Sequence, residues 1–325
     1  MSPARRVLVT GGGGYLGSQV VAALAGRSIE ALVSLDVREA PPGRRWPGVV
    51  HAAADIRDRS RLEALLREHA IDTVVHLAAI VTPGKKADRD FEYQVDVVGT
   101  GNVLDACVAA GVGHVVISSS GAAYGYHADN PAWLTEDDAI RGNQEFAYSW
   151  HKRLVEEMLA DYRVRAPQLQ QTVFRIGTIL GETVANQITA LFDKPRPLAI
   201  AGADSPFVFI WDQDVVGCIQ RAVVTETTGI FNVAGDGALT IHDIAARMGK
   251  RCRVLPAWAL RMALAVAKPL HLTQYGPEQL DFLRYRPVLA NRRLKEEFGY
   301  VPRKTSAEVF EFWRAARGIG PSRAA

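Results

Sequence analysis

The sequence predicts an α/β protein with a doubly wound parallel sheet, and three observations lead to this fold class. Short apolar runs alternate with longer segments whose apolar residues recur at helical spacing. A glycine-rich turn at residues 10–17 (TGGGGYLG) joins the first apolar run to the first helical segment. The next apolar run ends on an acid, Asp36. A strand, a glycine turn, a helix and a strand-end acid together predict a Rossmann-type sheet.

The expected elements follow one another in a regular order. Strands are expected at residues 5–10, 31–36, just before 54–58, 72–79, 114–120 and 171–177. Helices are expected at residues 15–25, from a capping box at 60–63 (SRLE), at 91–110 and at 146–162. Because a helix separates most successive strands, the sheet is predicted to be parallel.

After residue 177 the pattern loosens, which predicts a second region. Residues 193–207 are rich in proline and glycine, whereas 209–223 and 229–235 read as a return to the sheet. A second capping box (TSAE) stands at 305–308. We therefore expect a dinucleotide-binding domain over 1–176 with return segments at about 209–236. A smaller interleaved C-terminal substrate lobe is expected over 177–208 and 237–325.

Composition excludes several classes of function. The net charge is +3 and the basic residues are scattered, so no nucleic-acid partner is expected. The three cysteines are far apart and the histidines lack ligand spacing, which indicates a cytoplasmic protein without a metal site. No signal sequence precedes the glycine turn. Two basic residues interrupt the apolar stretch at 257–270, so it predicts an amphipathic helix and no membrane partner.

The glycine turn predicts a pyrophosphate site. Gly11, Gly14 and Gly17 fit the spacing TGxxGxxG. Glycines permit the tight turn and the close approach of a phosphate, and the helix that follows offers amide donors. Asp36 lies 19 residues after Gly17, where a carboxylate can bind both ribose hydroxyls and repel a 2′-phosphate. We expect NAD rather than NADP, although Arg38 argues the other way.

Residues 54–58 (ADIRD) follow the third expected strand. Asp55 is a candidate for bonding the adenine amino group, with Ile56 against the ring. The alternative is an ordinary aspartate at a strand end.

The chain resembles the extended short-chain dehydrogenase/reductase family, also called the NAD-dependent epimerase/dehydratase family. The resemblance rests on TGGGGYLG, HLAA (76–79), DVVGTGNVL (96–104), SSSGAAYG (118–125), YSWHK (148–152), FRIGTILG (174–181) and FNVAGDG (231–237). These motifs cover the chain to about residue 237. The cofactor contacts expected from the motifs and the resemblance are Gly11, Gly14, Tyr15, Leu16, Gly17, Asp36, Asp55, Ile56, Leu77, Ala78, Ala79, Tyr148 and Lys152.

The resemblance implies hydride transfer between C4 of nicotinamide and a carbinol carbon. Tyr148 and Lys152 are one helical turn apart. Tyr148 would be the acid/base, and Lys152 would hold the nicotinamide ribose and bring the tyrosine pKa toward working pH. Ser120 would bond the substrate oxygen, with Ser119 as the alternative.

Four other polar residues near these motifs are expected to be structural. The sequence favours Asp96 as a helix cap over a cofactor contact, and it favours structural contacts for His76 and Arg175. His151 is expected to point away from the tyrosine and lysine.

Departures from the family pattern bear on the substrate. Gly121 and Ala122 stand where family dehydratases carry an Asp-Glu pair, so dehydration is disfavoured. Phe207 stands where nucleotide-sugar enzymes place a phosphate-binding arginine. An apolar pocket of Phe207, Phe209 and Trp211 is one interpretation, and core burial is the other. Candidate substrate contacts are Ala122, Tyr124, Phe207 and Trp211, and the alternative phosphate ligands are Arg284, Arg286 and Arg292.

Three functions follow from these residues. The leading hypothesis is an NAD-dependent oxidoreductase acting on a secondary alcohol or ketone of a small, partly apolar substrate. The first alternative is a nucleotide-sugar (UDP-sugar) 4-epimerase with tightly bound NAD, and the second is an NAD-sensing regulatory protein. The resemblance also implies a homodimer formed through the helices at 91–110 and 146–162.

Overall fold

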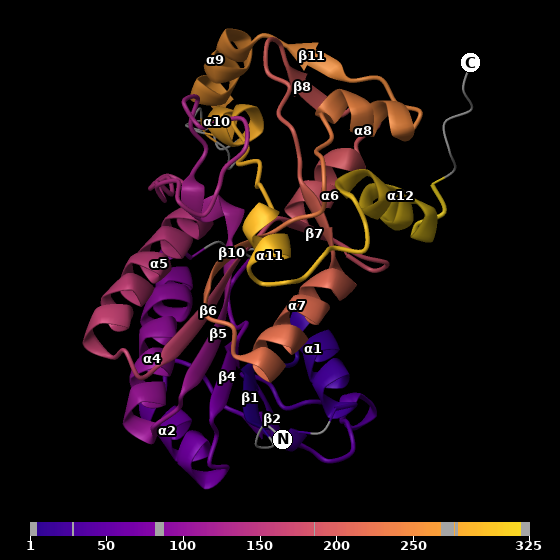
Figure 1. Ribbon diagram of the computed structural model, residues 1–325. Helices are drawn as coiled ribbons and strands as arrows, with labels where there is room; N and C mark the ends of the chain where they lie inside the picture. The colour runs from indigo at the N-terminus through magenta and orange to yellow at the C-terminus, as the bar shows by residue number, and fades with distance from the viewer. Residues whose placement is uncertain are drawn as a thin grey trace. The chain divides into compact units, whose positions relative to one another are not determined.

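The computed structural model describes residues 5–27, 29–81, 88–184, 186–267, 276 and 279–319 (Figure 1). The chain divides into two compact units. Unit 1 comprises residues 1–123, 146–175 and 213–231, and unit 2 comprises 124–145, 176–212 and 232–325. Residues 124–145, which we expected in the first domain, therefore belong to unit 2.

A seven-stranded sheet forms the centre of unit 1. Its order is β10-β6-β5-β4-β1-β2-β3, with pairing parallel from β5 to β3. The strands are β1 (Arg5–Thr10), β2 (Ile29–Asp36), β3 (Val49–Ala53), β4 (Thr73–His76), β5 (His114–Ser120), β6 (Gln170–Ile176) and β10 (Gly229–Val233). The strand order reverses between β1 and β4, and ligands of such sheets bind at the carboxyl edge beside this reversal. The predicted fold class is confirmed.

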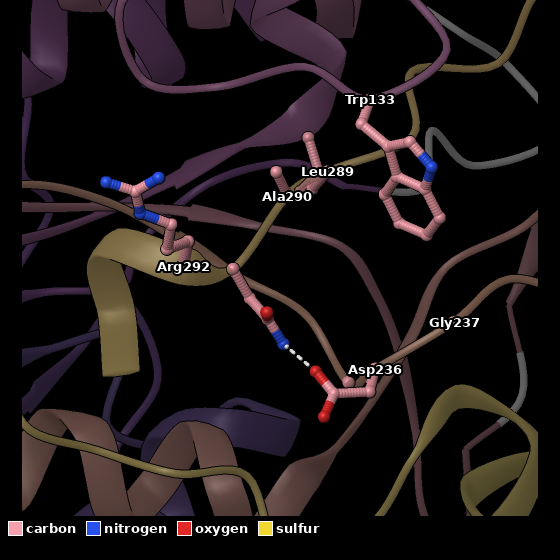
Figure 2. A pocket seen from close by; sticks show the side chains of 8 residues that line it. Trp133, Asp236, Gly237, Leu289, Ala290 and Arg292 are labelled. Carbon is pink, nitrogen blue, oxygen red and sulfur yellow. Dashed lines mark hydrogen bonds between the residues drawn. The ribbon is translucent and has the colours of Figure 1, made fainter. Parts of the chain in front are cut away.

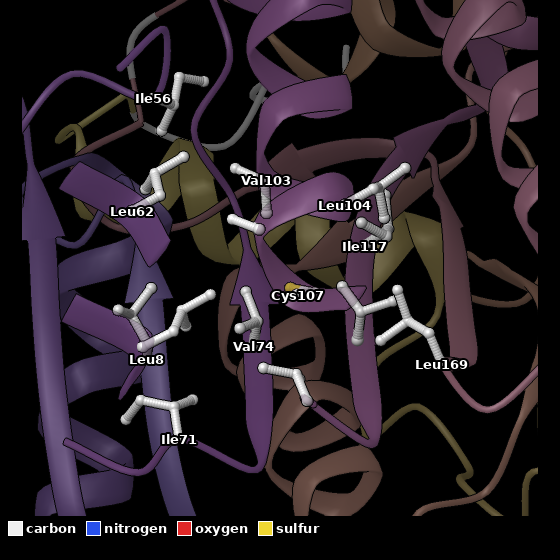
Figure 3. Close-up of a cluster of buried hydrophobic side chains, with 14 of the residues drawn as sticks. Leu8, Ile56, Leu62, Ile71, Val74, Val103, Leu104, Cys107, Ile117 and Leu169 are labelled. Atoms are coloured by element: carbon white, nitrogen blue, oxygen red, sulfur yellow. The ribbon is translucent and has the colours of Figure 1, made fainter. Parts of the chain in front are cut away.

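Helices cover both faces of this sheet (Figure 1). One face carries α1 (Tyr15–Ala25) and α7 (Asp212–Thr225). A hydrogen bond from the Gln220 side chain of α7 to the Ala23 carbonyl of α1 joins these two helices. The other face carries α2 (Arg59–Glu68), α4 (Gly99–Ala110) and α5 (Ala147–Arg165). Between these helices and the strands lies a core of aliphatic side chains that includes Leu8, Val74 and Leu104, each at most 1% exposed (Figure 3).

Two helix predictions differ from the structure. The helix α2 begins after Asp58, whose carboxylate accepts from the Arg61 amide, so the expected capping box at Ser60 was wrong. The helix expected at 91–110 consists of α3 (Arg89–Tyr93), a π-helical turn (Gln94–Val98) and α4. It does end as predicted at Gly111, whose φ of 76° favours glycine.

Unit 2 is built from short elements around an aromatic core. Its strands are β7 (Thr178–Leu180), β8 (Leu198–Ile200), β9 (Phe209–Trp211) and β11 (Arg253–Leu255), paired as β7 with β9 and β8 with β11. Its helices are α6 (Gln187–Phe192), α8 (Ile241–Arg247), α9 (Ala257–Ala267), α10 (Gln279–Arg284), α11 (Arg292–Glu296) and α12 (Ser306–Ala316). The predicted capping box of Thr305 and Glu308 opens α12.

Short 3-10 turns lie at Pro42–Arg44 and Gly121–Tyr124. Within the described ranges, no helix has the length and apolar character needed to cross a membrane.

Candidate active site

The glycine turn packs so closely that side chains would not fit at two of its positions. Gly11 has a φ of 68°, and a Cβ there would lie 2.8 Å from the Ala78 amide nitrogen. A Cβ at Gly17 would lie 2.0 Å from the Gly11 carbonyl oxygen. Glycine at these positions lets α1 and the segment after β4 approach the turn, as a dinucleotide-binding turn requires.

The helix α1 begins at this turn with an end suited to an anion. Its N-cap is Gly14, so no side chain caps its first amides, and its first turn contains no acidic residue. The partial positive charge of an eleven-residue helix is therefore not offset by a carboxylate in that first turn. Tyr15 and Leu16 are the first residues of this helix.

Asp36 lies beside the turn at the end of β2. Its Oδ2 accepts from the Gly13 amide at 3.0 Å, and its Oδ1 accepts from the Arg38 amide at 3.3 Å. The side chain is partly exposed, so its oxygens have room for further donors such as ribose hydroxyls. Along the same edge, the amides of Leu77 and Ala78 donate to Thr10 Oγ1. These residues fit an NAD molecule held along the carboxyl edge.

The two residues proposed for the adenine are engaged in other contacts. The Asp55 carboxylate forms hydrogen bonds of 2.6 to 3.0 Å with the Arg57 guanidinium, which hold its pKa below the ordinary value. Ile56 is 6% exposed and belongs to the apolar core. An adenine contact at Asp55 would have to share the carboxylate with Arg57.

The helix α5 places Tyr148 against the end of β5. The Tyr148 side chain hydrogen-bonds with the side chain of Ser120. One turn further along α5, Lys152 Nζ donates to the Ser118 carbonyl at 2.8 Å and lies 5.7 Å from the centre of the Tyr148 ring. The structure thus joins the three predicted catalytic residues in one cluster.

The next turn of α5 explains why Ser119 differs from Ser120. Ser119 Oγ donates to Glu156 Oε1 at 2.5 Å, and both side chains are buried. The geometry therefore favours Ser120 as the hydroxyl near the reacting oxygen.

Burial dominates the protonation of both helix residues. It raises the pKa of Tyr148 to about 12, which the hydrogen bond from Ser120 opposes and the charge of Asp96 reinforces. Burial lowers the pKa of Lys152, and the carboxylates of Asp96 and Glu156 oppose that shift. The pKa of Tyr148 therefore lies above its ordinary value in this structure, because burial has the largest effect on it, and the expected lowering by Lys152 stays a prediction.

Asp96 differs from the prediction, and His151 is its partner. Asp96 does not cap α4, because its Oδ1 accepts from the Ile80 amide at 2.8 Å and its Oδ2 lies 3.0 Å from His151 Nδ1. His151 was expected to point away from Tyr148 and Lys152, and its buried ring contacts Asp96. No sequence motif signals this pair, since the residues are 55 positions apart.

His76 and Arg175 are structural, as predicted. His76 is hydrogen-bonded to the hydroxyls of Thr10 and Thr100, and burial lowers its pKa to about 3. Arg175 forms a buried ion pair with Glu156.

Comparison with known proteins decides the family. A sequence model described as "NAD dependent epimerase/dehydratase family" matches residues 7–234. The chain belongs to this family. It is therefore an enzyme whose cofactor is NAD.

Individual relatives of this epimerase/dehydratase family enzyme are distant. An uncharacterized protein of Mycobacterium tuberculosis is 26% identical over 97% of this chain and 85% of its own length. A UDP-glucose 4-epimerase of Yersinia enterocolitica is 34% identical over 52% of each chain. The structure of a Thermus thermophilus UDP-glucose 4-epimerase with NAD superposes with a TM-score of 0.71 at 23% identity, covering 97% of this chain and 100% of that one. The structural likeness shows the shared fold.

Several residues expected to contact the substrate are buried in this family enzyme. Tyr124 is fully buried and donates to the Thr135 carbonyl. Phe207 and Phe209 are 3% and 0% exposed in the core of unit 2, so the core interpretation holds for both. Ala122 is 6% exposed. Only Trp211 among the four candidates keeps substantial exposed surface, beneath the cations of Arg303 and Lys304.

Unit 2 also holds two arginines with unsatisfied donors. The Arg286 guanidinium lies 4.1 Å from the ring centre of Phe207 and 4.4 Å from that of Phe282. The Nε atoms of Arg284 and Arg286 are buried and have no hydrogen-bond partner among the described residues. Burial lowers the pKa of Arg286 to about 10, which leaves it cationic at neutral pH. A buried cation with an unused donor suits an anion.

A surface hollow of about 300 Å³ lies elsewhere in unit 2 (Figure 2). Trp133, Asp236, Asn291 and Arg292 are among the residues that line it. The Asp236 carboxylate already accepts from Asn291 at 2.8 Å and from Lys295 at 2.5 Å. None of the predicted catalytic residues lines this hollow.

Proposed function

We propose that this enzyme transfers a hydride between NAD and a carbinol carbon of its substrate, with Tyr148 as the acid/base. The observation that carries the proposal is the cluster in which Ser120 bonds Tyr148 and Lys152 lies one helical turn away. A phenol, a hydroxyl donor and a buried ammonium beside an NAD-binding edge are the groups that carbinol oxidation and ketone reduction require.

In this proposal each residue has a defined task. Bound NAD supplies the nicotinamide that accepts or donates the hydride. Tyr148 exchanges the proton of the substrate hydroxyl at its phenolic oxygen. Ser120 donates to the same substrate oxygen and reduces the cost of negative charge there. Lys152 holds the nicotinamide ribose, and its charge favours the tyrosinate whenever Tyr148 acts as a base.

The arginines of unit 2 favour a substrate that carries phosphate. Phe207 cannot bind a phosphate, and this led us to expect a partly apolar substrate. Arg286 stacks on Phe207, however, and its Nε remains available. We therefore favour a nucleotide-sugar epimerase over a dehydrogenase of a partly apolar alcohol, and the similarity to a named UDP-glucose 4-epimerase over half the chain supports this choice. A dehydratase is disfavoured, because Gly121 and Ala122 supply no acid/base pair for dehydration. The dehydrogenase is therefore the second candidate.

The test begins with the purified protein. Bound NAD is measured after denaturation, and UDP-glucose and UDP-galactose are then supplied separately while proton NMR follows the sugar and absorbance follows NADH. An epimerase interconverts the sugars without accumulating NADH, whereas a dehydrogenase accumulates NADH with its alcohol. Replacing Tyr148 by Phe should lower turnover by about 10²–10⁴-fold while NAD still binds. Unchanged turnover in Tyr148→Phe would overturn the proposal.

The phosphate assignment has its own test. Arg286→Met should raise the KM for the UDP-sugar more than tenfold, since a charge-assisted contact is worth at least about 1.4 kcal/mol. Arg165→Met is the control, because that side chain is 52% exposed at the last residue of α5. Equal KM values for the two variants would contradict a phosphate role for Arg286.

A further inference from the structure

We propose that Asp96 is a positioning residue for the proposed reaction, held in place by its contact with His151. In this hypothesis the Asp96 carboxylate ties the segment after β4 to α5 and places a fixed negative charge beside the helix that carries Tyr148 and Lys152. The inference rests on the proposed function of the Tyr148 cluster, but it concerns a residue that this function does not itself use.

The first support is a set of contacts that joins three segments of unit 1. Asp96 lies on the π-helical turn between α3 and α4. It accepts from the Ile80 amide, one residue beyond the expected cofactor contacts at 77–79, and it contacts His151 of α5. The side chains of Asp96 and His151 are each 4% exposed. This burial and these hydrogen bonds fix the pair in place.

The second support is the electrostatic effect of the Asp96 carboxylate on Tyr148 and Lys152. Asp96 acts electrostatically on both members of the cluster, raising the pKa of Tyr148 and that of Lys152. The charge is effective because the groups are buried, where water screens it weakly. Its effect on Lys152 favours the ammonium, whereas its effect on Tyr148 opposes the tyrosinate.

Other charged and titratable groups face the same region. From α3, Glu92 is 5% exposed, and its Oε1 is buried with no partner among the described residues. Burial raises the pKa of Glu92, and the charge of Asp96 adds to that effect while His151 opposes it. The Tyr93 ring lies edge-on to His151 with the ring centres 5.8 Å apart.

Two groups act on Lys152 from other sides. Glu156 lies one turn further along α5 and raises the pKa of Lys152. His76 of β4 is a neutral neighbour, whose low pKa is reinforced by the charge of Lys152. Of the two carboxylates that act on Lys152, only Asp96 also acts on Tyr148.

The variant Asp96→Asn removes the charge of this side chain and keeps nearly the same shape. Asparagine has nearly the same size and its oxygen can still accept from the Ile80 amide, but it carries no charge. A purely structural role predicts no change in the titration of Tyr148. The proposed role predicts more tyrosinate in Asp96→Asn at any given alkaline pH.

The experiment is an ultraviolet titration of tyrosinate in NAD-saturated protein. The absorbance of Tyr148→Phe is subtracted from that of wild type. The absorbance of the double variant Asp96→Asn/Tyr148→Phe is likewise subtracted from that of Asp96→Asn. Each difference then reports Tyr148 alone. Circular dichroism and NAD binding define the pH range in which each protein is folded. We expect the Tyr148 midpoint to fall by about half a pH unit or more in Asp96→Asn. Asp96→Ser provides a second uncharged variant if the first does not fold.

Two controls identify the cause. His151→Gln alters the pair but retains the carboxylate, so Tyr148 should titrate as in wild type. Asp72→Asn removes another carboxylate of unit 1, which accepts from the Arg6 amide and the Thr73 hydroxyl, and should also leave Tyr148 unchanged. Equal tyrosinate fractions in wild type and Asp96→Asn would overturn the inference. The titration needs no substrate, so this failure is distinct from a failure of the proposed function, which would show as turnover that survives Tyr148→Phe.

Discussion

Arg175 and Glu156 form a buried ion pair that anchors α5 to β6. The Nη2 atom of Arg175 lies 2.7 Å from Glu156 Oε2, and its Nε lies within 3.0 Å of both carboxylate oxygens. The side chains are 5% and 3% exposed. Because Glu156 is on the same helix as Tyr148 and Lys152, this pair fixes the position of the candidate acid/base along the sheet.

Removing one partner of this pair should be costly. Glu156→Gln leaves the Arg175 guanidinium buried without a counter-charge, and we expect the free energy of unfolding in urea to fall by about 3–5 kcal/mol. The double variant Glu156→Leu/Arg175→Met should recover most of that loss, since it leaves no buried charge. Glu296→Gln in the exposed pair with Arg292 is the control and should cost less than about 1 kcal/mol. Similar costs for Glu156→Gln and Glu296→Gln would contradict the prediction.

Lys152 should reduce stability while serving catalysis. Its pKa is lower in the folded protein than in the unfolded chain, so its protonated form opposes folding below the folded pKa, and this cost disappears above the unfolded pKa. Lys152→Met should therefore melt no lower than wild type at pH 7, while its turnover falls. Differential scanning calorimetry at pH 7 checks this, and a clear loss of Tm would show that the contact with the Ser118 carbonyl matters more than burial.

His76 should make folding sensitive to acid. Its pKa is about 3 in the folded protein against 6.5 for an ordinary histidine, so below pH 6.5 the unfolded chain binds a proton that the folded protein does not. Stability is then full above pH 6.5 and falls as the pH is lowered toward 3. Between pH 7 and pH 5 this one group contributes a loss of about 2 kcal/mol.

Urea unfolding of His76→Gln and wild type at both pH values tests this prediction. The variant should lose less stability on acidification than wild type. His242→Gln, at an exposed position on α8, serves as the control and should retain the full acid dependence. The prediction fails if His76→Gln and wild type lose equal stability.

Asp36 should determine the choice between NAD and NADP. Asp36→Asn keeps an oxygen that can accept from the Gly13 amide but removes the charge that would repel a 2′-phosphate. We expect the ratio of NADP to NAD affinity to rise about tenfold or more, measured by calorimetry. Glu39→Gln removes an exposed carboxylate three residues further on and should leave the ratio unchanged. An unaltered ratio in Asp36→Asn would mean that another group selects the cofactor.

Much of the parallel sheet was predictable because its signals are local. The helix Tyr15–Ala25 and the strand His114–Ser120 match their expected ranges, since a glycine turn and an apolar run mark their limits in the chain. The start of α2 was misplaced because Asp58 and Ser60 both suit a helix cap, and only the backbone path shows that Asp58 accepts the bond. The π-helical turn within residues 91–110 also left no mark in the hydrophobic pattern.

Local patterns were enough to predict the Rossmann-type sheet, the glycine turn with Asp36 and the pairing of Tyr148 with Lys152 on one helix, because each depends on spacing over a few residues or on the order of elements. The folded chain was needed to show that Ser120 rather than Ser119 meets Tyr148, that Phe207 lies in the core under Arg286, and that Asp96 contacts His151. Burial and long-range contacts set which polar groups meet and how strongly their charges interact. Those quantities depend on the packing of distant segments, which local patterns do not encode.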